Sequence, residues 1–173
     1  MTEFVFIRHA EPDFSRRGTL IYRGWGECMA TLSEKGEAQA RALAEDAAVQ
    51  GADTILTSPY SRALHTAAIL SRALDLPLTV EPLLHEWCAD RNYAYLTQAE
   101  ADARYADFLA HDGVAPAEGC EWESIADVQR RVDSVLARYT EYKKVLVVCH
   151  GMLMQYYFGI DHPEHTEYRA IMK

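Results

Sequence analysis

Short apolar runs alternate with helix-forming segments along the chain, and this alternation restricts the fold more than any other feature of the sequence. Strand-like runs rich in Val, Ile, Leu and Phe occur at residues 4–7, 53–58, 78–80 and 144–149. Helix-forming segments lie between and after them, at 34–50, 59–74, 98–112 and 123–139. A further helix is expected after Gly151. Strands separated by helices predict an α/β fold: a three-layer sandwich with a mostly parallel central sheet flanked by helices.

Several local signals set the expected ends of these elements. Ser33 and Thr97 precede helix-forming segments and are expected N-caps. Pro59 is expected at the first position of its helix, where the missing N–H costs nothing. The helix that begins after Ser33 is expected to continue until Gly51 stops it. Residues 8–31 are expected to form a long loop.

Length and charge limit what the chain can bind. At 173 residues, a single domain spanning 1–173 is expected. The formal net charge is −9, so the bulk surface should repel nucleic acid and anionic membranes. An anionic ligand must therefore be captured by a local cluster of positive groups. Nothing in the sequence indicates an oligomeric state.

The cysteines and the apolar runs indicate where the protein works. The four cysteines are scattered and form no Cys-x-x-Cys pair, which favours a reducing compartment. No apolar run approaches the length of a membrane span, and no signal peptide is recognisable at the N-terminus. We therefore expect a cytoplasmic protein with no membrane partner.

Ionisable side chains follow the ends of the predicted strands. Arg8 and His9 come directly after the first strand, and His150 comes directly after the last strong one. Glu86 follows the strand at 78–80, and Arg62 lies one turn into the helix after the second strand. In open α/β sheets, ligands bind outside the carboxyl ends of the strands. The sequence therefore predicts that these five groups converge on a local anion site.

The types of these residues narrow the anion to a phosphate. Two arginines supply planar donor forks that match phosphate oxygens, and neither deprotonates at working pH. A histidine can attack phosphorus through a neutral ring nitrogen, and a carboxyl group can protonate a leaving alkoxide. Helix N-termini near residues 59 and 151 would add backbone N–H groups. These parts suffice for phosphoryl transfer through a phosphohistidine without a metal or another cofactor.

Six segments of the chain form an ordered set of motifs: "FIRHAE", "LSEKGEAQARALA", "DTILTSPYSRALHTAAIL", "LLHEW", "ESIADVQRRV" and "VLVVCHG". In this order they resemble the motifs of the histidine phosphatase superfamily, also called phosphoglycerate mutase-like. Together they cover nearly the whole chain. The resemblance implies a phosphoglycerate mutase-like fold and phosphoryl-transfer chemistry.

The resemblance also implies a role for each matched residue. His9 would be the phosphorylated nucleophile, and Glu86 would be the proton donor to the leaving group. The matched positions that would hold the phosphoryl group are Arg8, Arg62, His150 and the backbone around Gly151. The substrate would be a small phosphorylated molecule, with a phosphoprotein as an open alternative.

Two departures from the family pattern keep alternative functions open. Ala10 stands where the first motif usually has glycine, and "WCADRNYAYLT" follows Glu86 in place of the common pattern. A metal-independent phosphatase is favoured, and a short cap within about 87–122 argues against the larger cofactor-dependent mutases of the family. A cofactor-dependent phosphoglycerate mutase-type phosphotransferase is the first alternative. A phosphate-binding regulatory module with little turnover is the second.

Other residues near the predicted site have two readings each. The aromatic residues after Glu86 could form a wall facing the substrate or could pack the cap onto the sheet: Trp87, Tyr93, Tyr95, Tyr105 and Phe108. Arg91 could reach a second anionic group, although a solvated arginine is the simpler interpretation. His162 and His165 could suggest a metal site, but a polar surface loop is favoured because no second cluster completes a ligand set.

Overall fold

Five strands form one sheet in the computed structural model, which describes residues 1–19, 24–94 and 96–173. They are β1 (Glu3–Arg8), β2 (Thr54–Thr57), β3 (Leu78–Val80), β4 (Lys144–Cys149) and β5 (Tyr168–Met172). Their spatial order is β3-β2-β4-β1-β5; β5 pairs antiparallel with β1, and the other pairs are parallel. The prediction of a mostly parallel sheet is confirmed.

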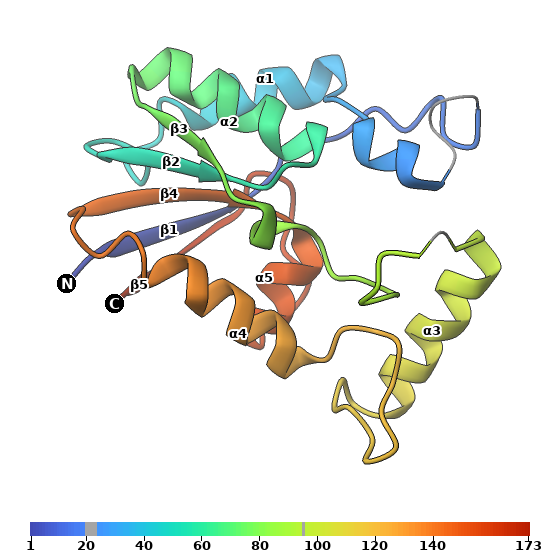
Figure 1. The fold of residues 1–173 in the computed structure, drawn as a ribbon. Coiled ribbons are helices and arrows are strands. Elements are labelled where there is room, and N and C mark those ends of the chain that lie inside the picture. Colours follow the sequence, from blue (N-terminus) through green and yellow to red (C-terminus); the bar gives the residue numbers. More distant parts are fainter. Residues whose placement is uncertain (20–23, 95) are drawn as a thin grey trace.

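Helices cover both faces of this sheet, which confirms the three-layer sandwich (Figure 1). The helices α1 (Glu34–Leu43) and α2 (Ser61–Leu74) lie on one face, and α4 (Ile125–Leu136) and α5 (Gly151–Phe158) lie on the other. An apolar core lies on each face of the sheet, and successive strand residues point alternately into one core and the other. Val145 and Val147 of β4 join the core under α4 and α5, whereas Leu146 and Val148 join the core under α1 and α2. Period-two alternation thus places apolar side chains on both faces of a fully buried strand.

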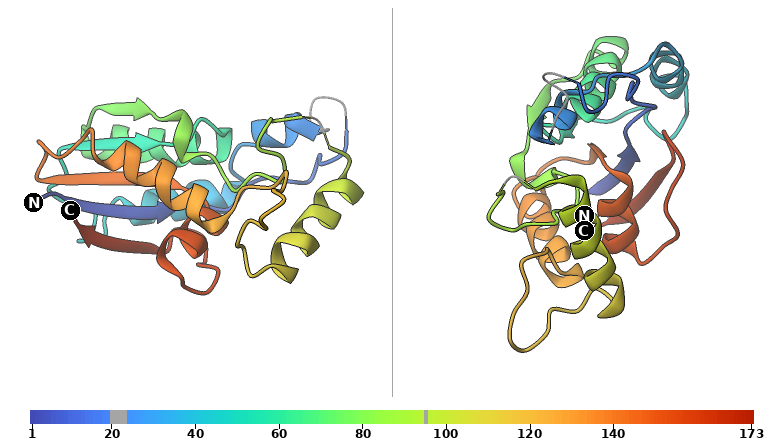
Figure 2. Two further views of the ribbon diagram at one scale, coloured as in Figure 1. Left: turned by 60° about the horizontal axis from the view of Figure 1, so that its bottom comes forward. Right: turned by 90° about the vertical axis from the view of Figure 1, so that its right-hand side faces the viewer.

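The segment predicted to be a cap lies beyond the carboxyl ends of the parallel strands (Figure 2). Its helix α3 (Gln98–Ala110) buries Phe108 against Trp122 and Tyr156. Two short 3-10 helices complete the described elements: η2 (Gly24–Met29), inside the expected loop, and η3 (Pro82–Leu84), after β3. Residues 20–23 of that expected loop lie outside the described residues. The assignment of one domain with a cap within 87–122 stays a prediction.

Two expected helix boundaries are wrong. The first helix ends at Leu43 rather than near Gly51, because the Asp46 carboxylate accepts the Ala48 N–H at 2.8 Å and turns the chain. In the second case the helix begins at Ser61, with Tyr60 as its N-cap, so Pro59 lies outside it. The expected N-caps Ser33 and Thr97 are confirmed, and Thr97 forms a capping box with Glu100. None of the described helices is both long and apolar enough to cross a membrane.

Candidate active site

His9 and His150 lie side by side because their strands are adjacent in the sheet. The register pairs Arg8 of β1 with Cys149 of β4, and the His9 N–H donates to the Cys149 carbonyl at 3.0 Å. The two imidazole rings that follow are 5.2 Å apart between centroids, and both side chains are buried. The convergence that the strand ends predicted is therefore present for this pair.

The hydrogen bonds of His9 fix which ring nitrogen carries the proton. Its Nδ1 lies 2.8 Å from the Ala10 carbonyl oxygen, which can only accept, so Nδ1 is the protonated nitrogen. Its Nε2 accepts from Nε of Arg62 at 3.0 Å and therefore carries a lone pair. Burial, reinforced by the charge of Arg62, holds the pKa of His9 well below its usual value. The ring is thus a neutral imidazole whose basic nitrogen faces a guanidinium group.

Ala10 fits its position with ordinary backbone geometry. It is not among the described residues with positive φ, and its methyl group is buried beside Leu32 and Ala40. The Ala10 N–H donates to Oγ1 of Thr66 at 3.0 Å, and Thr66 donates in turn to the Arg62 carbonyl at 2.8 Å. The backbone after His9 is therefore tied to the helix that carries Arg62, and alanine in place of glycine does not crowd the site.

Replacing Thr66 with valine is expected to lower both stability and turnover. Valine keeps the shape but leaves the buried Ala10 N–H without an acceptor, which costs about 1–3 kcal/mol. His9 and Arg62 also lose the bond that ties their segments together. Urea denaturation and steady-state kinetics check this, with Thr66→Ser as the matched control because it keeps the hydroxyl group. Equal stability of the valine and serine variants would contradict the assignment.

Arg8 and His150 present buried polar atoms that no described residue satisfies. Nε2 of His150 lies 2.7 Å from Oγ of Ser58, while its Nδ1 has no hydrogen-bond partner among the described residues. Arg8 donates from Nη1 to the Pro163 carbonyl at 2.5 Å, and its buried Nε likewise lacks a described partner. Burial lowers the pKa of Arg8, although Glu86 opposes the shift. Buried groups of this kind are the natural contacts of an oxyanion.

Gly151 leaves space that the end of the His162 side chain fills, so a larger residue there would require His162 to move. A Cβ built there would lie 2.3 Å from Cε1 of His162 and 3.2 Å from Nε of Arg8. The residue opens α5 directly after His150, so its backbone approaches Arg8 closely. This packing is compatible with the expectation that the backbone around Gly151 helps to hold a phosphoryl group.

Glu86 lies at the N-terminus of α5. Its Oε1 accepts from the backbone N–H of Trp87 at 3.0 Å and of Leu153 at 2.9 Å. The carboxylate therefore reaches the helix that begins just after His150, although its segment follows β3 at the far edge of the sheet. Glu86, the expected acid, therefore lies at the same end of the sheet as His9 and His150.

The return segment before β5 is part of the site, which the sequence interpretation missed. His165 lies 5.7 Å from His9 between ring centroids, and the Thr166 N–H donates to the Arg8 carbonyl at 3.1 Å. Thr166 has φ of 63°, which is rare for a β-branched residue. His162 is exposed and His165 is half-buried, so the segment is a polar surface loop that also reaches the site: antiparallel pairing of β5 with β1 returns it to Arg8. No spacing in the sequence signals that pairing.

The whole-chain comparisons agree with this geometry. Residues 4–163 match the profile of the histidine phosphatase superfamily (branch 1). The chain belongs to the histidine phosphatase superfamily. Its similarity to a 2,3-bisphosphoglycerate-dependent phosphoglycerate mutase of Methylobacterium radiotolerans is 30% identity over 167 residues, covering 85% of this chain and 73% of the relative. An uncharacterized phosphatase of Bacillus subtilis is 29% identical over 154 residues, covering 87% of this chain and 72% of the relative.

The solved structures of this superfamily show the same fold. A mycobacterial glucosyl-3-phosphoglycerate phosphatase in complex with VO3 superposes with a TM-score of 0.69 at 24% identity, covering 98% of this chain and 90% of that one. The superfamily relatives thus include both phosphatases and phosphoglycerate mutases. Their names support a phosphatase class of enzyme for this chain without distinguishing the individual reaction.

A buried ion pair holds the segment that contains Glu86. Arg131 of α4 donates from Nε to Oε1 of Glu123 at 2.5 Å and from Nη2 to Oε2 at 3.1 Å. The Glu123 carbonyl accepts from Nε1 of Trp87 at 2.7 Å, and its carboxylate accepts from the Cys88 N–H at 3.3 Å. The pair therefore fixes the segment that carries Glu86.

One cluster of potential metal ligands occurs among the described residues, formed by His85, Cys88 and Glu123. Both carboxylate oxygens of Glu123 already bind Arg131, and burial raises the pKa of the Cys88 thiol to about 12. His85 contacts the Tyr93 hydroxyl at 2.7 Å and its neighbouring carbonyl at 2.7 Å. The donor set is thus committed to hydrogen bonds and does not suit a cation beside Arg131.

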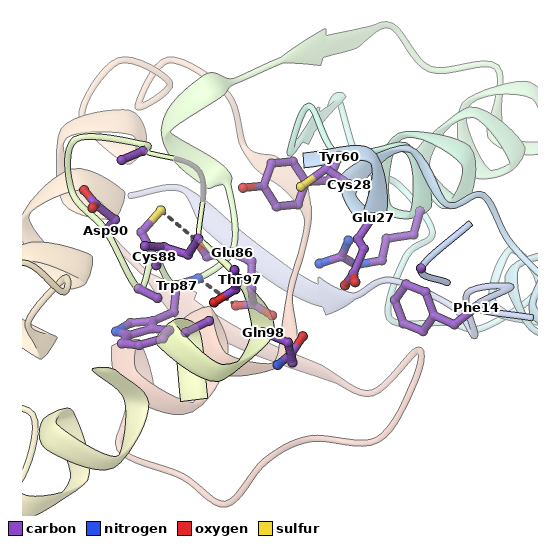
Figure 3. Close-up of a pocket in the computed structure, with 16 residues that line it drawn as sticks. Phe14, Glu27, Cys28, Tyr60, Glu86, Trp87, Cys88, Asp90, Thr97 and Gln98 are labelled. Carbon is purple, nitrogen blue, oxygen red and sulfur yellow. Dashed lines mark hydrogen bonds between the residues drawn. The ribbon is translucent and has the colours of Figure 1, made fainter. Parts of the chain in front are cut away.

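A cavity of about 460 Å³ opens beside the site (Figure 3). Arg62 and Glu86 line it; Arg8, His9, His150 and Gly151 do not. Trp87 belongs to its wall and also contacts Tyr105 and Phe108, so this one aromatic residue fits both earlier interpretations. Phe108 is buried packing, and Tyr95 lies outside the described residues.

Proposed function

We propose that the protein is a metal-independent phosphomonoesterase that acts through a phosphohistidine. The observation that carries this proposal is the state of His9: its Nδ1 proton faces the Ala10 carbonyl, which leaves Nε2 as a lone pair beside Arg62. A neutral imidazole with a fixed tautomer is the form that attacks phosphorus.

In the first proposed step, Nε2 of His9 attacks phosphorus while the bond from phosphorus to the ester oxygen breaks. Arg8, Arg62 and Nδ1 of His150 donate to the phosphoryl oxygens and neutralise their charge, with help from the backbone at Gly151. Protonated Glu86 gives its proton to the leaving alkoxide. The products are the free alcohol, phosphorylated His9 and the Glu86 carboxylate.

In the second proposed step, water cleaves the phosphohistidine. The Glu86 carboxylate takes a proton from water as its oxygen attacks phosphorus, and the P–N bond breaks. Phosphate leaves, His9 recovers its lone pair and Glu86 is protonated again. Protons and charges therefore balance over one cycle, and no metal takes part.

The test is hydrolysis of a generic aryl phosphate in excess EDTA, combined with trapping of the enzyme during turnover. We expect turnover with EDTA present and a trapped phosphoenzyme that is labile in acid and stable in base, as a P–N bond is. Activity that disappears with EDTA and returns with a divalent cation would overturn metal independence. A phosphoenzyme that resists acid would overturn the histidine intermediate.

The mutase alternative rests on the superfamily relatives that are named phosphoglycerate mutases. Interconversion of phosphoglycerates after priming with a bisphosphorylated compound would favour it. Phosphate binding without turnover, unchanged by Glu86→Ala, would favour the binding module. Two departures from the family pattern motivated the binding module, and one of them was Ala10 in place of glycine. Because Ala10 has no positive φ, this substitution no longer supports that alternative.

The proposal extends to the setting of the enzyme. All four cysteines are free thiols, which suits the reducing cytoplasm that we propose as its location. A small phosphorylated substrate is proposed, because the cavity beside Arg62 is of the size that small-molecule ligands fill.

Stability is expected to fall as the pH drops below about 6.5, the ordinary histidine pKa. Burial holds the pKa of both His9 and His150 well below that value in the folded state, so the unfolded chain binds more protons there. Each histidine then contributes a slope of about 1.4 kcal/mol per pH unit until the pH reaches its folded pKa. Urea denaturation across this range measures the slope. His9→Asn should reduce it, and an unchanged slope would contradict a neutral buried His9.

A further inference from the structure

Two walls enclose the cavity that adjoins Arg62 and Glu86. One wall comes from the N-terminal part of the chain, with Phe14, Glu27 and Cys28, together with Tyr60 (Figure 3). The other comes from the cap, between Trp87 and Ala101. Because Arg62 faces His9 and Glu86 is the proposed acid, a phosphate ester bound at His9 would direct its alcohol portion into this cavity.

Among the described residues, the arginines next to the cavity lining already have partners. Arg17 donates to Glu27 at 2.9 Å and Arg104 donates to Asp90 at 2.5 Å. Arg91 donates to the Cys120 carbonyl at 2.6 Å. Arg62 is the one cationic side chain in the described lining, and it faces the phosphoryl position. No described lining residue offers a second, uncommitted positive charge for a carboxylate or another phosphate of the substrate.

The polar side chains of the cap wall are committed as well. Thr97 and Glu100 bind each other in the capping box of α3. Gln98 donates to Asp102 at 2.7 Å and accepts from Arg17 at 3.0 Å. Asp90 accepts the Asn92 N–H at 2.7 Å in addition to Arg104. A substrate with many hydroxyl groups would therefore have to displace internal hydrogen bonds to be recognised here.

The remaining surface of the cavity is aromatic and aliphatic. Its aromatic and aliphatic lining residues are Phe14, Tyr60, Trp87, Ala89, Ala94, Leu96 and Ala101. The Arg62 guanidinium lies over the Tyr60 ring at 5.2 Å, so an aromatic face continues directly from the phosphoryl end. Such a surface binds through burial of apolar area, and it favours flat or compact apolar groups.

We propose that this cavity selects phosphate monoesters of uncharged, mainly apolar alcohols, an assignment that rests on the proposed phosphatase function. Esters that carry a second anionic group, such as phosphoglycerates, are disfavoured because that group would be desolvated beside Glu27, Glu86 and Asp90, where the described lining offers no free cation. Sugar phosphates are disfavoured because the described wall provides few free hydrogen-bonding groups. The alcohol portion thus sets the specificity, while the phosphoryl end supplies the common anchor.

The test compares benzyl phosphate with 4-carboxybenzyl phosphate and glucose 6-phosphate. The two benzyl esters have nearly equal leaving groups and differ in one carboxylate. We expect kcat/KM for benzyl phosphate to exceed both others by about 10-fold or more, as differential binding of one charged group permits. Equal or faster hydrolysis of the carboxylated ester or the sugar phosphate would overturn the inference while leaving the phosphatase function intact.

Binding of the two phosphonate analogues separates this inference from catalysis. Benzylphosphonate should bind about 10-fold more tightly than 4-carboxybenzylphosphonate in isothermal titration calorimetry, whether or not any ester is hydrolysed. If no ester is hydrolysed, the proposed function fails. The ratio of the two binding constants then tests by itself whether the cavity prefers uncharged groups. Equal binding, or no measurable binding of benzylphosphonate, would overturn the inference.

A lysine introduced into the wall should change the preference. Ala101→Lys places a free cation in the lining, so the ratio of kcat/KM for carboxybenzyl over benzyl phosphate should rise about 5-fold or more. Ala106→Lys on the same helix is the matched control, because Ala106 is exposed and outside the cavity. It changes the net charge equally and should leave the ratio within about 2-fold, since distant surface charges are screened. Equal effects of the two lysines would contradict binding of the alcohol portion at this wall.

Discussion

Replacing His9 with alanine is expected to lower phosphate ester hydrolysis by at least about 10³-fold, because removal of a covalent nucleophile eliminates the proposed pathway. The loss should appear mainly in kcat, since Arg8, Arg62 and His150 remain to hold the phosphate. The variant should also give no acid-labile phosphoenzyme in the trapping experiment. Steady-state kinetics in EDTA, together with trapping by an alkaline quench that preserves a P–N bond, measures both effects.

Two controls make this result specific to the nucleophile. His111→Ala removes an exposed histidine at the end of α3, and its activity should stay within about 2-fold of the parent, as for most surface substitutions. Circular dichroism and phosphate-dependent thermal stabilisation of His9→Ala would show that the fold and the anion site persist. Turnover that survives in a folded His9→Ala variant would exclude His9 as the nucleophile.

Replacing Glu123 with glutamine is expected to reduce the free energy of unfolding by about 3 kcal/mol, because a buried Arg131 would be left without its counter-charge. The side chains of Arg131 and Glu123 are only 9% and 7% exposed, so water cannot replace the lost carboxylate. For a chain of this length, such a loss lowers Tm by about 6–12 °C. Urea denaturation and differential scanning calorimetry provide the measurement.

The matched control is a surface pair of the same chemistry. Glu37 and Arg41 form an ion pair on α1 with side chains that are 38% and 63% exposed, and Glu37→Gln should change stability by less than about 0.5 kcal/mol. Replacing both buried partners, Glu123→Leu with Arg131→Met, should recover much of the stability lost in Glu123→Gln. Equal losses of unfolding free energy in Glu123→Gln and Glu37→Gln would show that the buried pair stabilises the fold no more than the surface pair does.

Local patterns predicted the framework of this protein well. The continuous apolar run at 144–149 became a central strand buried on both faces, and the amphipathic segment after Ser124 became α4 with its apolar stripe on the sheet. Ser33 and Thr97 capped helices as expected, because capping depends on residues within one turn. The first helix was predicted too long because the competing Asp46 turn has no strong signature in an alanine-rich segment.

The residues proposed for phosphate chemistry were recognisable because they follow strand ends in family-like motifs. The contacts that these residues make with distant segments could not be recognised from the sequence. His165 approaches His9 only because β5 returns along β1, and Glu86 reaches α5 across the intervening β2 and β4. Neither contact has a sequence spacing that would signal it.

The sequence by itself determined the alternation of strands and helices, the caps, and the charged groups at the ends of β1 and β4. These depend on interactions between residues close in the chain, which leave periodic or short motifs. The tertiary structure alone decided the tautomer of His9, the packing of His162 on Gly151 and the committed cations around the cavity. Each of these depends on hydrogen bonds or contacts between distant segments, and their geometry exists only when the chain is folded.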